Sequence, residues 1–160
     1  MISLEQLGKE FKRNTRVIEM QTEGLTHADS LLQPEARGNC MNWVLGHIVA
    51  SRDTVLKMLG QERLLSESEN KRYNNGSEPI LEDGEDVIRL ERLLELIQEG
   101  QERIEESLAK LELKDMDEMV GKKGNTRFGD RLHFWYFHET YHTGQTEYLR
   151  QLAGTDDKVI

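Results

Sequence analysis

The stretch VIRLERLLELIQEGQERIEESLAKL, residues 87–111, decides the fold class because its core positions recur at helical spacing without a break. Steps of three and four residues bring one side chain per turn onto one face of a helix, as in a coiled-coil seam. Glutamate and arginine fill the other faces. The stretch therefore predicts a long amphipathic helix, whose seam is formed by Val87, Leu90, Leu94, Ile97, Gln101, Ile104, Leu108 and Leu111.

Three further helices follow from the same periodicity on either side of this stretch. One is expected over residues 3–32 and another over residues 41–59. The last helix begins at Thr126 or Phe128 and ends at Ala153. Gly60 directly follows the helix over residues 41–59, Gly154 directly follows the last helix, and each glycine is expected to end its helix.

The segments between these helices indicate how they are connected. Residues 61–84 are rich in glutamate, serine, asparagine and glycine, which predicts a long crossover with a short helical turn before Asn74-Asn75-Gly76. Residues 114–125 form a second connection, and strand-like runs are missing. We therefore expect an all-α fold, a four-helix bundle with long crossover connections in up-up-down-down order. Residues 1–160 form one such domain, with residues 155–160 as a frayed tail.

The composition argues against several classes of protein. A formal charge of -9 disfavours a nucleic-acid partner, because that affinity comes from lysine and arginine. No apolar run approaches the roughly 20 residues of a membrane span, and the residues after Met1 do not resemble a signal peptide. The single cysteine, Cys40, precludes an intramolecular disulfide and fits a reducing compartment. We expect a cytoplasmic protein with no nucleic-acid or membrane partner.

The segment HETYH, residues 138–142, carries the strongest indication of chemistry. Two histidines four residues apart on a helix lie about 40° apart around its axis and one turn apart along it, so both imidazoles can reach one metal ion. His138 and His142 fall on the inward seam of the last helix, where burial is costly unless each nitrogen has a partner. His47, on the apolar face of the second helix, can face this pair across the bundle. These three histidines are the candidate metal ligands.

Two other interpretations of the histidine pair stay open. Both histidines can be ordinary core residues, hydrogen-bonded to Asn14, Thr22 or Ser51. The same five residues also spell His-Glu-x-x-His, in which two histidines bind zinc and the glutamate acts as the general base of a hydrolase. No further histidine follows His142 and no edge strand is visible to hold a peptide, so a hydrolase of this kind is the least favoured interpretation.

Polar residues near the pair are candidates for catalytic or supporting roles. Gln145, one turn beyond His142, can touch a bound group, bond to a ligand, or be a core polar residue. Glu139 is the other catalytic candidate, but it points about 100° away from His138, which favours a place outside the ligand set. Cys40 is better interpreted as a small buried residue before the second helix than as a redox residue.

Two segments of the chain resemble the DinB-like superfamily, also called the DinB/YfiT-like metalloenzymes. NWVLGHI, residues 42–48, is similar to the second-helix segment of that family. HETYHTGQ, residues 138–145, is similar to its last-helix pattern, His-x-x-x-His followed by x-Gly-Gln. The helix count and the long connections match as well, so the resemblance spans essentially the whole chain. One departure is Thr143, where the family often has arginine; this leaves the ligand set untouched.

This resemblance implies a divalent metal ion, zinc or nickel, bound by His47, His138 and His142. Members of the family are often dimers, and the few with known activities are S-transferases or isomerases that use low-molecular-weight thiols. We therefore expect a homodimeric, metal-dependent enzyme, a transferase or a hydrolase, that acts on a small molecule. The alternative is a protein that binds metal without catalysis, as a sensor or a dimeric structural module.

Overall fold

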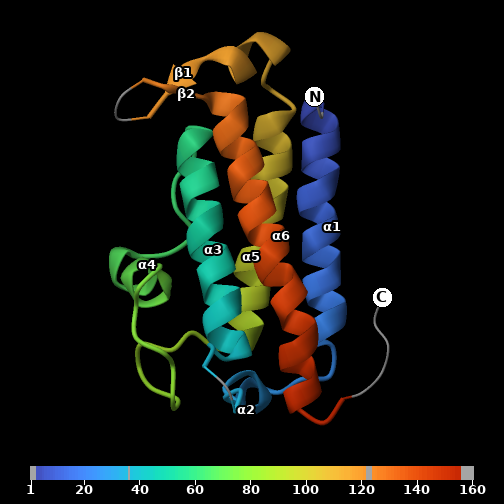
Figure 1. Ribbon diagram of the computed structural model, residues 1–160, viewed down its shortest axis with the longest axis vertical. Helices are drawn as coiled ribbons and strands as arrows, with labels where there is room; N and C mark the ends of the chain where they lie inside the picture. The colour runs from blue at the N-terminus through green and yellow to red at the C-terminus, as the bar shows by residue number, and fades with distance from the viewer. Residues whose placement is uncertain (1–2, 36, 122–123, 156–160) are drawn as a thin grey trace.

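The computed structural model describes residues 3–35, 37–121 and 124–155, and these residues are mostly helical, as predicted (Figure 1). Four long helices lie side by side: α1 (Leu4–Thr22), α3 (Met41–Met58), α5 (Leu90–Leu108) and α6 (Phe128–Leu152). Shorter elements occupy the connections: α2 (His27–Ser30), α4 (Glu67–Tyr73), the 3-10 helix η1 (Leu113–Asp117) and a hairpin of β1 (Met119–Val120) and β2 (Thr126–Arg127). From residue 156 onward, the predicted frayed tail lies outside the described residues.

Three of the expected helices end close to their predicted limits, and the first does not. α1 ends at Thr22 instead of continuing to residue 32, because Gly24 takes a left-handed backbone conformation with φ of 77°. Thr26 then begins α2 with a capping box, in which its hydroxyl and backbone amide bond with Asp29. The apolar periodicity continues across this break, so periodicity alone predicts one helix.

The predicted up-up-down-down order is wrong. α1 and α6 run in one direction and α3 and α5 in the other, so the first two long helices are antiparallel (Figure 1). Hydrogen bonds agree with this, because Asn42 bonds to Ile88, just before α5, and Arg52 bonds to Ile97 further along it. Residues 59–89 traverse the bundle, whereas the connection from α1 to α3 lies at one end of it and the connection from α5 to α6 at the other (Figure 1). One crossover instead of two produces the observed order.

The core consists of two apolar clusters with buried polar residues between them. α3 packs on α5 and α6, and α1 packs on the same two helices. One cluster includes Ile48 and Leu93, and the other includes Phe11 and Ile104. Between the clusters, each long helix contributes at least one buried polar side chain to what we term the polar layer: Asn14, Thr15, Arg52, Gln101 and Glu139.

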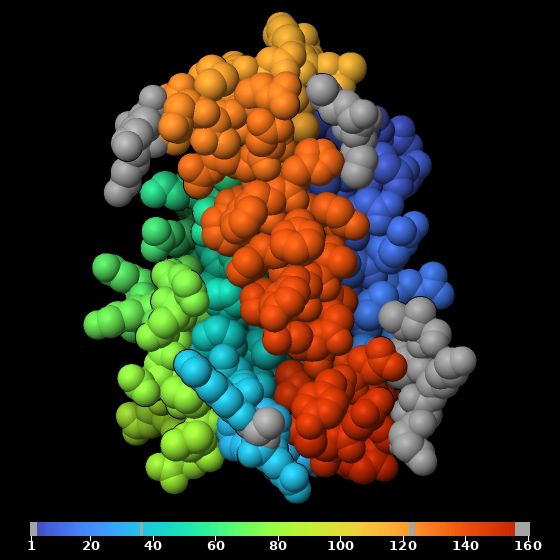
Figure 2. All heavy atoms as spheres, viewed as in Figure 1, coloured from blue at the N-terminus to red at the C-terminus, as the bar shows by residue number. Residues whose placement is uncertain are grey.

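One face of α6 is open to solvent and lies along the middle of the molecule in Figure 2. Large side chains on this helix are exposed, namely Phe134, Phe137, Tyr141 and Tyr148. Within the described ranges, no helix combines the length and the apolar character that a membrane span requires. The open face of α6 borders the pocket described below.

Candidate metal centre

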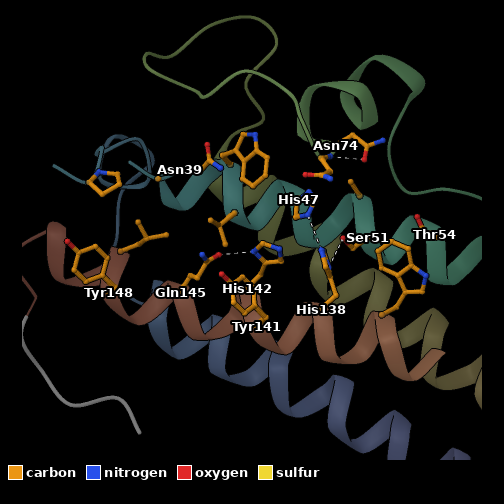
Figure 3. Close-up of a pocket in the computed structure, with 18 of the residues that line it drawn as sticks. Asn39, His47, Ser51, Thr54, Asn74, His138, Tyr141, His142, Gln145 and Tyr148 are labelled. Atoms are coloured by element: carbon orange, nitrogen blue, oxygen red, sulfur yellow. Dashed lines mark hydrogen bonds between the residues drawn. The ribbon is translucent and has the colours of Figure 1, made fainter. Parts of the chain in front are cut away.

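The structure brings the three candidate ligands together between α3 and α6 (Figure 3). His138 and His142 lie one turn apart on α6, and His47 faces them from the antiparallel helix α3. Nε2 of His47 lies 3.4 Å from Nε2 of His138. One ring nitrogen from each residue falls within 4.8 Å of the others. The spacing that predicted the triad therefore corresponds to a compact cluster.

Each of these imidazoles has a hydrogen-bond partner at Nδ1. His47 donates from Nδ1 to the carbonyl oxygen of Tyr73 at 2.8 Å, and His142 donates to Oε1 of Gln145 at 2.7 Å. Nδ1 of His138 lies 3.4 Å from the hydroxyl of Ser51. A carbonyl oxygen only accepts, so the proton of His47 and of His142 is on Nδ1 and the lone pair is on Nε2. Partners of this kind orient histidine ligands in metal sites.

The donor set fits a divalent transition metal. At 3.4 Å, the Nε2 atoms of His47 and His138 can share either a proton or a cation. A single proton serves only two of the three nitrogens, whereas a cation can accept a lone pair from all three. Three imidazole nitrogens that leave another position open are typical of catalytic zinc sites, and imidazole also suits nickel.

Burial keeps the three imidazoles neutral at physiological pH. It lowers the pKa of His47, against the raising effect of the bond to the Tyr73 carbonyl. Burial, together with the nearby His47, also lowers the pKa of His138. It lowers the pKa of His142 to about 4, although the bond to Gln145 opposes this shift. Metal ligands must be deprotonated, so the cluster is ready to coordinate at neutral pH.

The cluster lines an open pocket of about 730 Å³ between α3 and α6. Aromatic rings and amide side chains form much of its wall, namely Trp43, Phe134, Trp135, Tyr141, Tyr148, Asn39, Asn74, Asn75 and Gln145. The indole of Trp43 stacks on the His47 ring at 4.8 Å between centroids, which restricts that imidazole. No carboxylate belongs to the part of the pocket wall that the structure describes, although the chain carries a charge of -9. The pocket therefore suits a neutral or anionic ligand.

Glu139 lies away from the pocket, in the polar layer. Its two carboxylate oxygens accept hydrogen bonds from Nε and Nη2 of Arg52, both at 2.8 Å. A general base must reach the proton that it abstracts, and this carboxylate is oriented toward the core instead. The geometry argues against the His-Glu-x-x-His hydrolase interpretation and agrees with the expected place of Glu139 outside the ligand set.

Sequence reasoning missed the residues that hold His47 in place. Gly46 leaves room for the ring of Tyr73, which would clash with a Cβ at that position. The Tyr73 hydroxyl donates to Oδ1 of Asn42 at 2.9 Å and accepts from the amide of Ile88 at 2.8 Å. This network holds the end of α4 against α3 and so places the Tyr73 carbonyl beside His47. The glycine before His47 was the one available signal, because helix-interior glycines often mark close approach.

Two other residues of types that can bind metals, His27 and Cys40, lie outside the cluster. The amide of Leu90, at the start of α5, donates to Nδ1 of His27 at 3.1 Å, and Nε2 of this histidine lies 3.2 Å from Asp83. Cys40 is fully buried directly before α3, and burial raises the pKa of its thiol. Both positions suit structural roles, as was the favoured interpretation of the cysteine.

A helical bundle with three convergent histidines in an open pocket is compatible with a metal-binding protein in which the ligands project from facing helices. The chain belongs to the DinB superfamily, whose profile matches residues 10–146. A crystal structure of a conserved protein from Enterococcus faecalis is similar, with a TM-score of 0.76 over 97% of this chain and 99% of that chain. The two are 16% identical, so this likeness concerns the fold. No curated protein matches the chain significantly.

Proposed function

We propose that this DinB-superfamily chain is a divalent-metal-dependent enzyme that acts on a small molecule. The observation that carries the proposal is that three imidazoles converge on the wall of an open pocket. Each ring directs one nitrogen into the cluster, and its other nitrogen lies within hydrogen-bond distance of a protein oxygen. A purely structural metal is normally enclosed by four protein ligands, whereas a catalytic one keeps a position for water or substrate. The open pocket favours the second kind of site.

The residues of the pocket suggest separate roles. His47, His138 and His142 would hold the cation, which supplies Lewis acidity to the group that completes its coordination. Trp43 and Trp135 offer flat apolar surface to the body of a substrate. Gln145 orients His142 through its Oε1 and is the remaining catalytic candidate, because its amide also lines the pocket.

Among reaction classes, we propose thiol-dependent S-transfer or isomerisation. A pocket without carboxylates on its described wall does not repel a thiolate, and a thiolate is a good ligand for zinc or nickel. The identity of the metal, the thiol cosubstrate, the homodimer and the cytoplasmic location stay predictions from sequence and family resemblance. The non-catalytic sensor or structural module is the alternative that the experiment below separates from the enzyme.

The first test is the metal content of the purified protein beside two histidine variants. We expect about one equivalent of zinc or nickel in the wild type, and none in His142→Ala, because two ligands are too few for a stable site. His133→Ala is the matched control, since His133 is on the same helix but outside the cluster, and it should retain the metal. Equal metal content in wild type and His142→Ala would refute the centre.

A second measurement separates the enzyme from the non-catalytic alternative. The metal-loaded wild type is incubated with low-molecular-weight thiols and a panel of electrophiles and isomerisable substrates. S-transfer is followed as consumption of the free thiol, and isomerisation, which regenerates the thiol, as conversion of the second substrate. Turnover of either kind by the wild type, with none by His142→Ala, supports a thiol-dependent enzyme. Stoichiometric metal without turnover on any member of the panel would favour a sensor or a structural module.

A further inference from the structure

The guanidinium of Arg52 contacts all three of the other long helices. It forms two parallel hydrogen bonds with Glu139 of α6, from Nε to Oε2 and from Nη2 to Oε1, both at 2.8 Å. Nη2 also donates to the hydroxyl of Thr15 on α1 at 2.8 Å, and Nη1 donates to the carbonyl oxygen of Ile97 on α5. The side chains of Arg52 and Glu139 are 0% and 1% exposed.

This ion pair is directly beside the metal cluster along both helices. Glu139 follows His138 on α6, and Arg52 follows Ser51, whose hydroxyl lies 3.4 Å from Nδ1 of His138. Neighbouring residues on a helix point about 100° apart. The contact between Ser51 and His138 therefore lies on the pocket side, and the pair of Arg52 and Glu139 lies in the core. Adjacent turns of α3 and α6 therefore carry the histidines toward the pocket and the ion pair toward the core.

The geometry of the pair constrains how α3 and α6 slide past one another. Two parallel hydrogen bonds between a guanidinium and a carboxylate require a fixed relative orientation. A shift by one residue moves a helix by about 1.5 Å, which would break both bonds. Metal–ligand distances tolerate only about 0.2 Å. His47 is on α3 and His138 is on α6. A contact that fixes α3 against α6 close to these two histidines is therefore needed.

Stability alone is a weak reason for a buried ion pair, because apolar residues of similar volume often serve as well. The neighbouring structure nevertheless accommodates this one. Gly100 on α5 leaves the space that the arginine occupies, since a Cβ there would lie 3.1 Å from Cδ of Arg52. Asn14 adds a further bond to Oε1 of Glu139 at 3.3 Å.

We propose that Arg52 and Glu139 are positioning residues of the metal centre, which set the register of α3 against α6 and thereby the distance between His47 and the His138–His142 pair. In this role the glutamate of the His-Glu-x-x-His segment is neither a general base nor a ligand. The inference rests on the proposed metal function and deepens it, because two residues that do not bind the metal would set the distances between those that do.

The test replaces the pair by apolar residues of similar volume, Arg52→Met with Glu139→Leu, and uses Co²⁺ as the probe. We expect the dissociation constant for Co²⁺, measured by competition with a chromophoric chelator, to rise by about 10- to 100-fold. The ligand-field absorption of bound Co²⁺ should change shape as well, since the histidines no longer meet at the same distances. Thermal unfolding in the presence of chelator reports the stability of each protein separately.

Ile104→Ala is the matched control, because Ile104 is fully buried in the apolar cluster on the other side of the polar layer. This variant should unfold at a lower temperature and still bind Co²⁺ with the affinity and spectrum of the wild type. Arg52→Lys is a milder second variant, which keeps the charge but cannot form two parallel bonds with the carboxylate. It should also weaken Co²⁺ binding and alter the spectrum, to a smaller degree.

The outcomes separate this inference from the proposed function. If the wild type binds Co²⁺, and either folded variant of the pair keeps its affinity and spectrum, the positioning role is overturned and the metal function stands. If affinity falls in Ile104→Ala as much as in the pair variants, the effect is one of general stability and the positioning role is again overturned. If the wild type binds no Co²⁺, the proposed function itself fails.

Discussion

At the residue scale, two glycines in the motif segments have opposite consequences for the helices that contain them. Gly46, directly before His47, faces the ring of Tyr73, and a methyl group there would clash with it. Gly144, two residues after His142, is exposed, and a Cβ there meets nothing within 4 Å. Close packing therefore requires the first glycine, whereas the second only lowers the helix propensity of α6.

Alanine at the two positions should accordingly change stability in opposite directions. Gly46→Ala should lower the free energy of unfolding by about 1–3 kcal/mol, because the ring of Tyr73 must move. The same variant should weaken metal binding, because the carbonyl oxygen of Tyr73 moves away from Nδ1 of His47. Gly144→Ala is the control and should raise the free energy by roughly 0.5–1 kcal/mol. Urea unfolding of the metal-free proteins and metal titration measure both effects. A Gly46→Ala protein as stable as the wild type would contradict the packing argument.

The histidine cluster was predictable because its signal is local. A spacing of four residues on one helix, and an imidazole on an apolar face of another, are visible without any tertiary information. The roles of Tyr73 and Arg52 were not predictable in this way. Tyr73 contributes a backbone carbonyl to His47, which leaves no mark in the sequence, and an arginine on a helix usually lies in solvent.

At the scale of elements, Asp53 on α3 holds the crossover of residues 59–89 against the bundle. Its carboxylate accepts hydrogen bonds from the amides of Leu64 at 2.6 Å and Leu65 at 3.3 Å. A third bond, also 3.3 Å long, comes from the side chain of Asn70 on α4. Burial raises the pKa of Asp53, while these bonds oppose the shift. One carboxylate thus anchors the segment that carries the Tyr73 carbonyl to the histidine cluster.

Removal of this carboxylate should loosen the crossover. We expect Asp53→Ala to lower the free energy of unfolding by about 1–3 kcal/mol, because the partly buried amide of Leu64 and the buried amide of Leu65 lose their acceptor. Hydrogen exchange at the amides of Leu64 and Leu65 should become faster than in the wild type. Asp130→Ala removes an exposed partner of Arg127 and should change stability by less than about 1 kcal/mol. Unchanged protection at both amides in Asp53→Ala would refute the anchoring role.

Helices were more predictable than the directions in which they run. The apolar period fixes where a helix lies in the chain, and α3, α5 and α6 match their predicted spans closely. The short turn expected in the crossover is α4, which begins with a capping box between Ser66 and Glu69. The order depended instead on which connection traverses the bundle, and connection length alone does not show this. η1 and the β1–β2 hairpin both lie at one end of the bundle, so the connection from α5 to α6 does not cross it.

At the scale of the whole molecule, the buried histidines connect folding to pH. The pKa of His142 is about 4 in the folded protein against 6.5 for the free side chain, and the pKa values of His47 and His138 are lowered as well. The unfolded chain therefore binds more protons as the pH falls below about 6.5. The metal-free fold should lose stability as the pH falls below about 6.5, and the part of this loss that His142 contributes should be complete near pH 4.

Thermal unfolding between pH 8 and pH 4, with and without a divalent cation, measures this effect. We expect the midpoint of the metal-free protein to decrease below about pH 6.5, and that of His142→Ala to decrease less, because one depressed group is gone. The cation should raise the midpoint at pH 7 and lose this effect in acid, since protons compete for the same nitrogens. A cation-induced shift that is equal at pH 7 and at pH 4 would be inconsistent with histidine ligation.

The long separation between the ligands also dictates when the cluster can exist during synthesis. His47 and His138 are 91 residues apart, and α6 leaves the ribosome after the other three long helices. A nascent chain that ends before α6 presents only His47 of the three clustered histidines, and Arg52 is without the carboxylate that neutralises it. If the cluster binds a metal ion as proposed, tight capture becomes available only after α6 has been made and has docked. A translation product without α6 would then compete poorly for that metal.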